Sequence, residues 1–307
     1  MSSILQGLGV LAVVIAVGFL LARFRVLPEG TQQILARLVF FVATPALLFR
    51  TLSGAPVGTV LSSALGVTAI TTAVGAIGYL VIARVRRKSL GESVIGALAS
   101  SYVNAGNLGI PLSTYLFGTA AYVAPVMMYQ LIVLAPIAFV ALDIAETGKR
   151  PSVLRVALQP VRNPLVLASA LGVVMALGGW SLPAVVVRPI DMIAGIAVPG
   201  ALIAFGMSLY GAPLPGRTGS RTELTLIAVL KMLVLPVVAY CLGQFVFQMD
   251  PVAVLAATLA AALPTAQNVF VYAIRYHVGE ALAREAVLVT TILSVPELIA
   301  VVGIVHR

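Results

Sequence analysis

A chain of 307 residues that is 61% hydrophobic and only 9% charged cannot bury its apolar side chains in one soluble core, because soluble domains carry about a quarter charged residues. A transmembrane helix needs about 20 predominantly apolar residues, so this composition is typical of an integral membrane protein with many spans. A net charge of +9 would suggest nucleic-acid binding in a soluble protein, but in a membrane protein Lys and Arg report topology first.

Division of the chain at charges and at Pro and Gly clusters predicts ten membrane spans. In chain order they cover residues 4–22, 31–52, 58–83, 92–117, 121–142, 163–180, 189–210, 223–247, 252–276 and 281–304. The longest polar interruption, residues 146–162, lies between the fifth and sixth spans. We therefore expect an all-α membrane protein with a first five-helix repeat (1–145), a cytoplasmic linker (146–162) and a second five-helix repeat (163–307).

The basic residues favour an orientation with the amino terminus outside, because cytoplasmic loops retain Lys and Arg. With that orientation, 14 of the 19 Lys and Arg residues fall in cytoplasmic loops, and three, Arg50, Arg188 and Arg307, fall outside. The cluster Arg84–Lys88 is interpreted as a topology anchor rather than as a nucleotide or lipid-headgroup site. We expect a multi-pass protein of the cytoplasmic membrane with both termini outside.

Each half of the chain holds an odd number of spans, so duplicated halves must lie upside down relative to each other. A shift of 161 residues superposes Ala105 on Ala266 and Asn107 on Asn268, among other identical pairs. The two asparagines fall near the middle of the fourth and ninth spans. The sequence therefore predicts two inverted five-helix repeats.

The fourth and ninth spans also carry helix breakers and amides at mid-membrane. A broken helix exposes backbone groups that hydrocarbon cannot satisfy, so the breaks must face protein, water or a ligand. The amino-terminal ends of half-helices offer N–H groups and positive potential to an anion. We predict that these two helices cross and are broken near Gly106–Pro111 and near Pro264–Asn268, although amides also bond between helices without any ligand. The residues of this predicted substrate site are Asn104, Gly106, Asn107, Pro111, Pro264, Thr265, Gln267 and Asn268.

Charges inside spans are costly and usually functional. Lys231, in the eighth span, is interpreted either as a counter-charge for an anionic substrate or as half of a structural ion pair. Glu297, in the tenth span, is a candidate proton carrier unless it lies near the outer interface. Gln130 and Thr44, which precedes the proline of a kink, complete the predicted supporting residues, and H⁺ or Na⁺ is the expected coupling ion.

Four segments together resemble the auxin efflux carrier family, which includes plant PIN proteins and bacterial organic-acid permeases: Phe40–Phe49, Asn104–Pro111, Lys231–Pro236 and Leu263–Phe270. The resemblance covers all ten spans, and the short linker is similar to that of prokaryotic members. It implies a scaffold from spans 1, 2, 6 and 7 that forms a homodimer, and a mobile transport domain from spans 3–5 and 8–10. Asn104 matches the asparagine that binds the substrate carboxylate in plant members.

We expect a secondary transporter that moves a small organic anion, such as a carboxylate, by elevator-type alternating access. The alternative is a sodium-coupled carrier of the bile-acid type, which shares this architecture and in which Gln267, Asn268 and Glu297 serve a cation. A membrane-embedded enzyme is a distant alternative, because no clustered catalytic residues are visible. One cysteine, Cys241, and two histidines, His277 and His306, give no disulfide framework and no zinc spacing. We therefore expect no metal, no cofactor and no nucleic-acid partner.

Overall fold

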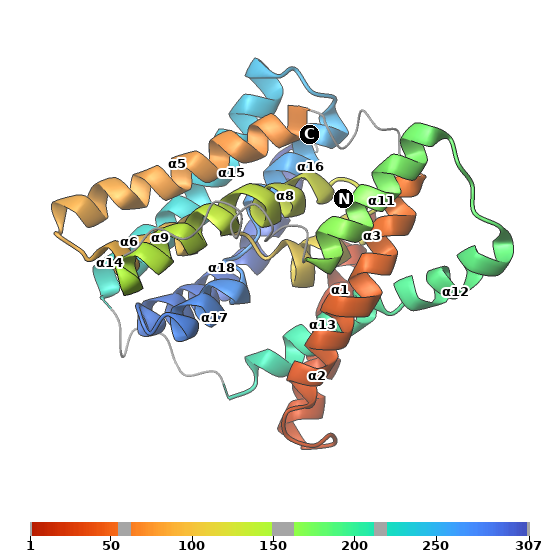
Figure 1. Cartoon of the computed structure of the whole chain (residues 1–307), viewed down its shortest axis with the longest axis horizontal. Coiled ribbons are helices and arrows are strands. Elements are labelled where there is room, and N and C mark those ends of the chain that lie inside the picture. Colours follow the sequence, from red (N-terminus) through yellow and green to blue (C-terminus); the bar gives the residue numbers. More distant parts are fainter. Residues whose placement is uncertain (1, 55–62, 149–162, 212–219, 306–307) are drawn as a thin grey trace. The chain divides into compact units, whose positions relative to one another are not determined.

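The computed structural model describes residues 2–54, 63–148, 163–211 and 220–305 (Figure 1). The regular secondary structure in these ranges is helical, and the predicted all-α class is confirmed. Six described helical segments are long and apolar enough to cross a membrane: Thr31–Ser53, Ser63–Val85, Ala124–Thr147, Ala184–Leu209, Arg221–Val246 and Glu280–Val305. Residues 149–162 of the predicted linker, the start of the third span at residue 58, and His306 and Arg307 lie outside the described residues.

The chain forms two compact units, and each unit draws on both halves of the sequence. The labels η mark five-residue π-helical stretches. The first unit contains α1 (Ser2–Arg23), α2 (Thr31–Leu38), η1 (Val39–Ala43), α3 (Thr44–Ser53), η2 (Ala105–Gly109), α7 (Ile110–Phe117), most of α8 (Ala124–Tyr129), α11 (Pro164–Gly178), α12 (Ala184–Ala194) and α13 (Ala197–Leu209). The second unit contains α5 (Ser63–Val85), α6 (Leu90–Ser101), η3 (Gln130–Leu134), α9 (Ala135–Thr147), α14 (Arg221–Val229), η5 (Leu230–Val234), α15 (Leu235–Cys241), η6 (Leu242–Val246), α16 (Pro251–Ala261), α17 (Gln267–Arg275) and α18 (Glu280–Val305).

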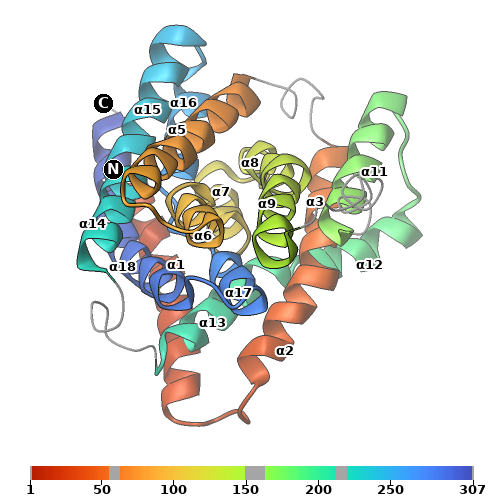
Figure 2. The same cartoon turned by 60° about the vertical axis from the view of Figure 1, so that its left-hand side comes forward.

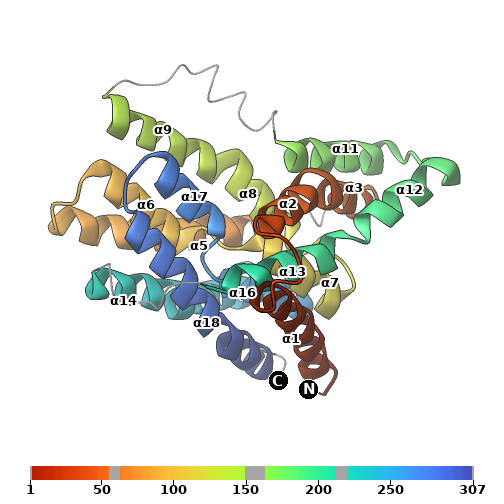
Figure 3. The ribbon, with the colours of Figure 1, turned by 90° about the horizontal axis from the view of Figure 1, so that it is seen from below.

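In the first unit, α1 packs along α13, and α3 packs against α11 and α12 (Figure 3). A Cβ atom at Gly18 of α1 would collide with the backbone of Ile203, and one at Gly206 of α13 would collide with the backbone of Ile15. Glycine at both positions therefore allows the two helix backbones to approach closely, as small residues do in membrane helix pairs. An ion pair between Arg50 and Asp191 joins α3 to α12.

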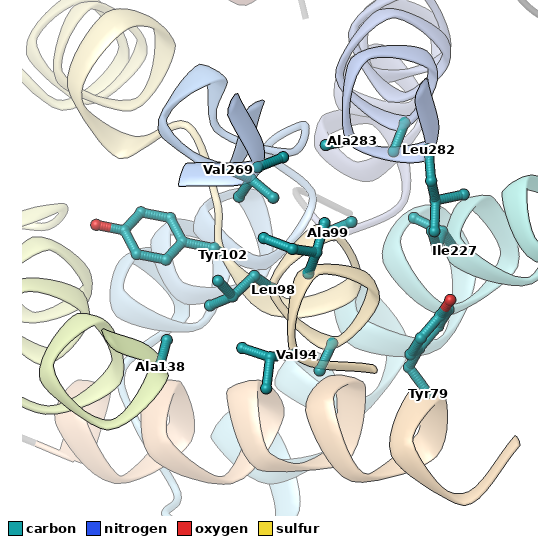
Figure 4. Packing of buried hydrophobic residues seen from close by; sticks show 14 of the residues in the cluster. Tyr79, Val94, Leu98, Ala99, Tyr102, Ala138, Ile227, Val269, Leu282 and Ala283 are labelled. Atoms are coloured by element: carbon teal, nitrogen blue, oxygen red, sulfur yellow. The ribbon is translucent and has the colours of Figure 1, made fainter. Parts of the chain in front are cut away.

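In the second unit, α6 packs against α5, α9, α14, α17 and α18 (Figure 2). Its residues from Val94 to Ser101 are all buried, as expected for a helix that is surrounded on every side. A Cβ atom at Gly96 would overlap the Tyr79 ring of α5, so glycine is required where these helices touch. Figure 4 shows the core around α6, in which Leu98 and Ala99 lie among side chains of α5, α9, α14, α17 and α18.

Candidate functional site

Both spans that were predicted to be broken are interrupted, and the two interruptions lie side by side in the second unit. α6 ends at Ser101, and residues 102–104 continue in a non-helical conformation. α16 ends at Ala261, and α17 begins only at Gln267. We call residues 102–104 together with residues 264–266 the crossover. The predicted spans 92–117 and 252–276 are therefore each divided into shorter helices.

The two crossover segments pair through their backbones in an antiparallel bridge. The Asn104 N–H donates to the Pro264 carbonyl at 2.8 Å, and the Ala266 N–H donates to the Tyr102 carbonyl at 3.0 Å. Pairing satisfies polar groups that a helix break would otherwise leave exposed to an apolar environment. The backbone at the breaks is thus partly used for the crossover itself.

The position of the first break differs from the prediction. We expected an interruption at Gly106–Pro111, but these residues are helical, in η2 and α7 of the first unit. Pro111 cannot donate a backbone hydrogen bond, and the preceding residues adopt the wider π-helical geometry in place of a break. Gly106, Asn107 and Pro111 directly follow the crossover along the chain.

Thr265 ties the crossover to its surroundings and is fully buried. Its backbone N–H donates to Thr290 Oγ1 of α18 at 3.0 Å. Its hydroxyl group donates to the Ala99 carbonyl at 2.6 Å, in the last turn of α6, where carbonyls lack intrahelical partners. Thr265 therefore holds the two broken helices and α18 together.

Three amide side chains lie at the crossover or next to it. Asn104 is 4% exposed, whereas Gln267 is half-buried and Asn268 is exposed. Gln267 and Asn268 are the first two residues of α17, and the preceding Ala266 makes no side-chain cap. The site thus combines amide groups with an uncapped helix amino terminus, which together favour an anion.

Two tyrosines belong to the site, and sequence reasoning missed both. Tyr102 is buried in the crossover, and its ring centroid lies 6.3 Å from that of Tyr272 in an edge-to-face arrangement. The Tyr102 hydroxyl group also interacts with Asn268 through a side-chain hydrogen bond. The available signals were the position of Tyr102 two residues before Asn104 and the spacing of Tyr272 one turn after Asn268. Thr290, which was also missed, is marked by the adjacent pair Thr290 and Thr291 in an apolar helix.

Two of the four predicted supporting residues lie in π-helical stretches, and a third directly follows one. Lys231 lies in η5 and is fully buried, Gln130 begins η3 and is 2% exposed, and Thr44 follows η1. π-Helical turns interrupt helices frequently at functional sites. Lys231 shares the second unit with Glu297, whereas Thr44 belongs to the first unit.

The basic cluster Arg84–Lys88 has an acidic partner that the sequence did not suggest. Lys88 Nζ lies 2.8 Å from Glu223 Oε1, and Arg86 Nη1 lies 3.8 Å from the same oxygen. The Tyr79 hydroxyl group donates to Glu223 Oε2 at 3.4 Å. The hydrogen bond to Glu223 raises the pKa of the Lys88 ammonium group above its usual value. These contacts fix the α5–α6 connection to α14.

Comparison with known proteins gives one family and two relatives. Residues 4–302 match the model of a family described as membrane transport protein. A "Putative malonate transporter" of Rhizobium meliloti (strain 1021) is 30% identical over 288 residues, which cover 92% of this chain and 89% of the relative. An "Uncharacterized transporter" of Methanothermobacter thermautotrophicus is 29% identical over 290 residues, which cover 93% of each chain.

Proposed function

Because the chain belongs to the membrane transport protein family, we propose that it is a secondary transporter that moves a small organic anion across the cytoplasmic membrane. The auxin-efflux-carrier resemblance seen in the sequence is confirmed by this membership. The family and both relatives are transporters and not enzymes, which removes the enzyme alternative. The substrate, the mechanism and the coupling ion are our proposals.

The crossover is the structural feature that most supports the proposed anion site. Two helices break in the apolar second unit, and they do so beside three amides and the uncapped start of α17. Such a break costs stability in a membrane protein unless the exposed groups find partners. A carboxylate that accepts hydrogen bonds from Asn104, Asn268 and the first turn of α17 would be such a partner.

A short carboxylate is the substrate class that we propose, and malonate is the first candidate. The relative named "Putative malonate transporter" matches this chain over 89% of its own length. Gln267 and Asn268 provide amide donors beyond those of Asn104, and a dicarboxylate has two groups that need donors. We therefore place the second carboxylate near the start of α17.

We propose that the crossover is where two inverted five-helix repeats meet, although any antiparallel bridge has a local two-fold axis. Residues 102 and 264 are 162 positions apart, as are residues 104 and 266. Exchange of the two segments with this shift turns the hydrogen bond from Asn104 to Pro264 into the one from Ala266 to Tyr102. A two-fold axis between the segments requires this exchange. The structural shift is one residue longer than the 161 residues found in the sequence, so the match at the crossover is in the backbone and not in identical side chains.

The two compact units support the proposed division into a scaffold and a transport domain. The first unit contains the helices of predicted spans 1, 2, 6 and 7 together with Ala105–Met127, and the second contains most of the remainder. We propose that the second unit carries the anion in an elevator movement and that the first unit forms a homodimer. We further propose that both termini lie outside, as the distribution of basic residues favours.

Binding to the purified protein tests this function. Calorimetric titration with malonate, succinate, acetate and a neutral diamide of malonic acid, with and without sodium, should give binding for a short carboxylate and none for the diamide. Binding that requires sodium would favour the sodium-coupled alternative. Binding of none of the carboxylates would contradict the proposed substrate class.

A further inference from the structure

A lysine and a glutamate lie buried at their charged atoms in the second unit without direct contact. Lys231 lies on η5 and Glu297 on α18. The ammonium nitrogen and both carboxylate oxygens are buried, and none of them makes a hydrogen bond with the described residues. Among those residues the two groups do not approach to the 4.0 Å of an ion pair, yet each acts electrostatically on the other.

Lys231 and Glu297 act electrostatically on each other within the described part of the second unit. The elements packed against η5 or α18 are α5, α6, α14, α15, α16 and α17. Of their charged and titratable groups and those of α18 itself, only Glu297 acts on Lys231 and only Lys231 acts on Glu297; the others are Tyr79, Arg84, Glu92, Arg221, Glu223, Tyr240, Cys241, Tyr272, Arg275, Glu280, Arg284 and Glu285. Lys231 and Glu297 are therefore each other's charged partner among the groups named here.

This geometry differs from that of a structural salt bridge. A buried ion pair repays the cost of leaving water only when direct, hydrogen-bonded contact is made. Lys231 and Glu297 are both buried at their charged atoms and lack that contact. A lysine–glutamate pair of this kind has two accessible charge states, because one proton on the carboxylate changes its net charge from zero to +1.

Both elements that carry the pair also contact the crossover or the helix that leads into it: α18 bonds to Thr265, and η5 packs against α6. Thr290 of α18 accepts the hydrogen bond from Thr265, and Glu297 follows seven residues later, about 10 Å along the helix. On the side of Lys231, Gly75 of α5 touches both the end of α6 and the start of α15. A Cβ atom at Gly75 would lie 2.7 Å from the Ser100 carbonyl oxygen and 3.2 Å from the Leu235 side chain. Lys231 precedes Leu235 by four residues, about one helical turn.

We propose that Glu297 takes up one proton when the anion binds at the crossover, so that the protein cotransports the anion with a proton. The proton comes from water on the loading side and returns to water on release, and no bond of the anion changes. Protonation leaves the Lys231 charge unopposed, and this charge offsets one negative charge of the anion. The inference rests on the proposed anion site and adds its coupling ion.

Coupling of anion binding to proton uptake predicts both the direction and the size of the change in anion affinity with pH. Because binding and proton uptake favour each other, anion affinity should rise as the pH falls through the range in which Glu297 titrates. One charge at about 10 Å with an effective dielectric constant of about 20 corresponds to roughly a tenfold change in affinity. The change should be absent when residue 297 cannot ionise.

Calorimetry of malonate binding to the full-length protein tests the proposal between about pH 5 and pH 9. Titrations in two buffers of different ionisation enthalpy report the protons taken up per anion. The wild type should take up close to one proton where affinity depends on pH. Glu297→Gln should bind malonate at all pH values with no proton uptake. Glu92→Gln, which changes a carboxylate that is 41% exposed at the start of α6, should behave like the wild type.

A second variant separates coupling from structural pairing. Lys231→Met should reduce affinity about tenfold at low pH and abolish proton uptake, whereas a structural role predicts a lower melting temperature with proton uptake retained. Wild-type binding without proton uptake overturns this inference and leaves the anion site standing. The wild-type measurement needs no variant to fold, and absence of any malonate binding would instead contradict the proposed function.

Discussion

The side chains of the crossover divide into those that hold its backbone and the amides that we propose to bind the anion. Thr265 donates its backbone N–H to the Thr290 hydroxyl oxygen and its own hydroxyl group to the Ala99 carbonyl. Asn104 donates its backbone N–H to the Pro264 carbonyl, so we propose that its amide side chain is the group that binds the ligand. Asn268 is exposed at the start of α17. We therefore expect substitutions of Thr265 to affect stability and substitutions of the asparagines to affect binding.

Replacement of either asparagine should weaken malonate binding while the protein remains folded. Loss of one hydrogen bond to a charged ligand costs about 1.5–3 kcal/mol, which is roughly a ten- to hundredfold loss of affinity. We predict this loss for Asn104→Ala and Asn268→Ala by calorimetry. Gln244→Ala, an amide exposed on η6, should leave affinity unchanged. Unaltered binding in both asparagine variants would mean that these amides only join helices.

Thr265→Val should lower stability, because it removes the hydroxyl group that satisfies the Ala99 carbonyl and keeps the side-chain volume. A buried carbonyl without its partner costs about 1–3 kcal/mol. A fall in melting temperature in detergent is the expected result. Thr225→Val is the matched control, since its hydroxyl group bonds the Arg221 carbonyl in an exposed turn. Equal melting temperatures for the two variants would contradict a structural role for Thr265.

The sequence predicted part of the crossover. Asn104, Pro264 and Thr265 were predicted because Pro and amides in an apolar run are conspicuous, and the structure brings them together. Tyr102 and Thr290 were missed because their roles depend on packing between segments far apart in the chain, which residue types alone do not report.

At the scale of the elements, proline explains four of the five described π-helical stretches. A proline follows the first residue of η1, η2, η3 and η5 by six positions; these are Pro45, Pro111, Pro136 and Pro236. Proline removes one backbone donor and crowds the carbonyl four residues earlier, and a wider turn relieves both effects. The prolines thereby set the rotation of the preceding side chains, Lys231 and Gln130 among them.

Pro236→Ala should let η5 return to regular α-helical geometry and turn Lys231 away from its present direction. Proline in a helix interior costs about 3 kcal/mol, so the protein should fold at least as well. We predict an unchanged or higher melting temperature together with a loss of proton-linked binding. Pro189→Ala changes a proline inside α12, where no π-helical stretch precedes it, and should have no effect on binding. Normal proton linkage in Pro236→Ala would show that the stretch does not position Lys231.

The apolar runs of the sequence predicted the presence of long helices well and the positions of helix breaks poorly. Ten spans were predicted from the apolar runs, and six described helices, among them Thr31–Ser53 and Glu280–Val305, have membrane-spanning length. The interruption of the fourth span was placed at Gly106–Pro111 because Gly and Pro weaken helices. Those residues stay helical, and the break occurs at residues 102–104, where the partner segment supplies the hydrogen bonds. Sequence periodicity contains no information about such a partner.

At the scale of the whole chain, each compact unit combines segments from both halves of the sequence. The crossover, Lys231 and Glu297 all lie in the second unit. If this unit moves as a body, the anion and the proton travel together, which is the simplest physical basis for cotransport. Both the elevator movement and the cotransport are proposals of this account.

Alternating access makes a prediction for a single introduced cysteine. In a Cys241→Ser background, Asn268→Cys should react with membrane-impermeant thiol reagents from both sides of the membrane, since the crossover is expected to face each side in turn. Gln33→Cys, exposed on α2 of the first unit, should react from one side only. Reaction of residue 268 from a single side under all conditions would argue against movement of the second unit.

Counterflow in proteoliposomes tests the central claim most directly. Liposomes loaded with unlabelled malonate and diluted into labelled malonate should accumulate label transiently when they contain the wild-type protein. The Asn104→Ala variant should accumulate far less at the same external concentration, and Gln244→Ala should match the wild type. Absence of counterflow above protein-free liposomes, for malonate and for every other carboxylate of the panel, would contradict the assignment of this protein as a carrier of small organic anions.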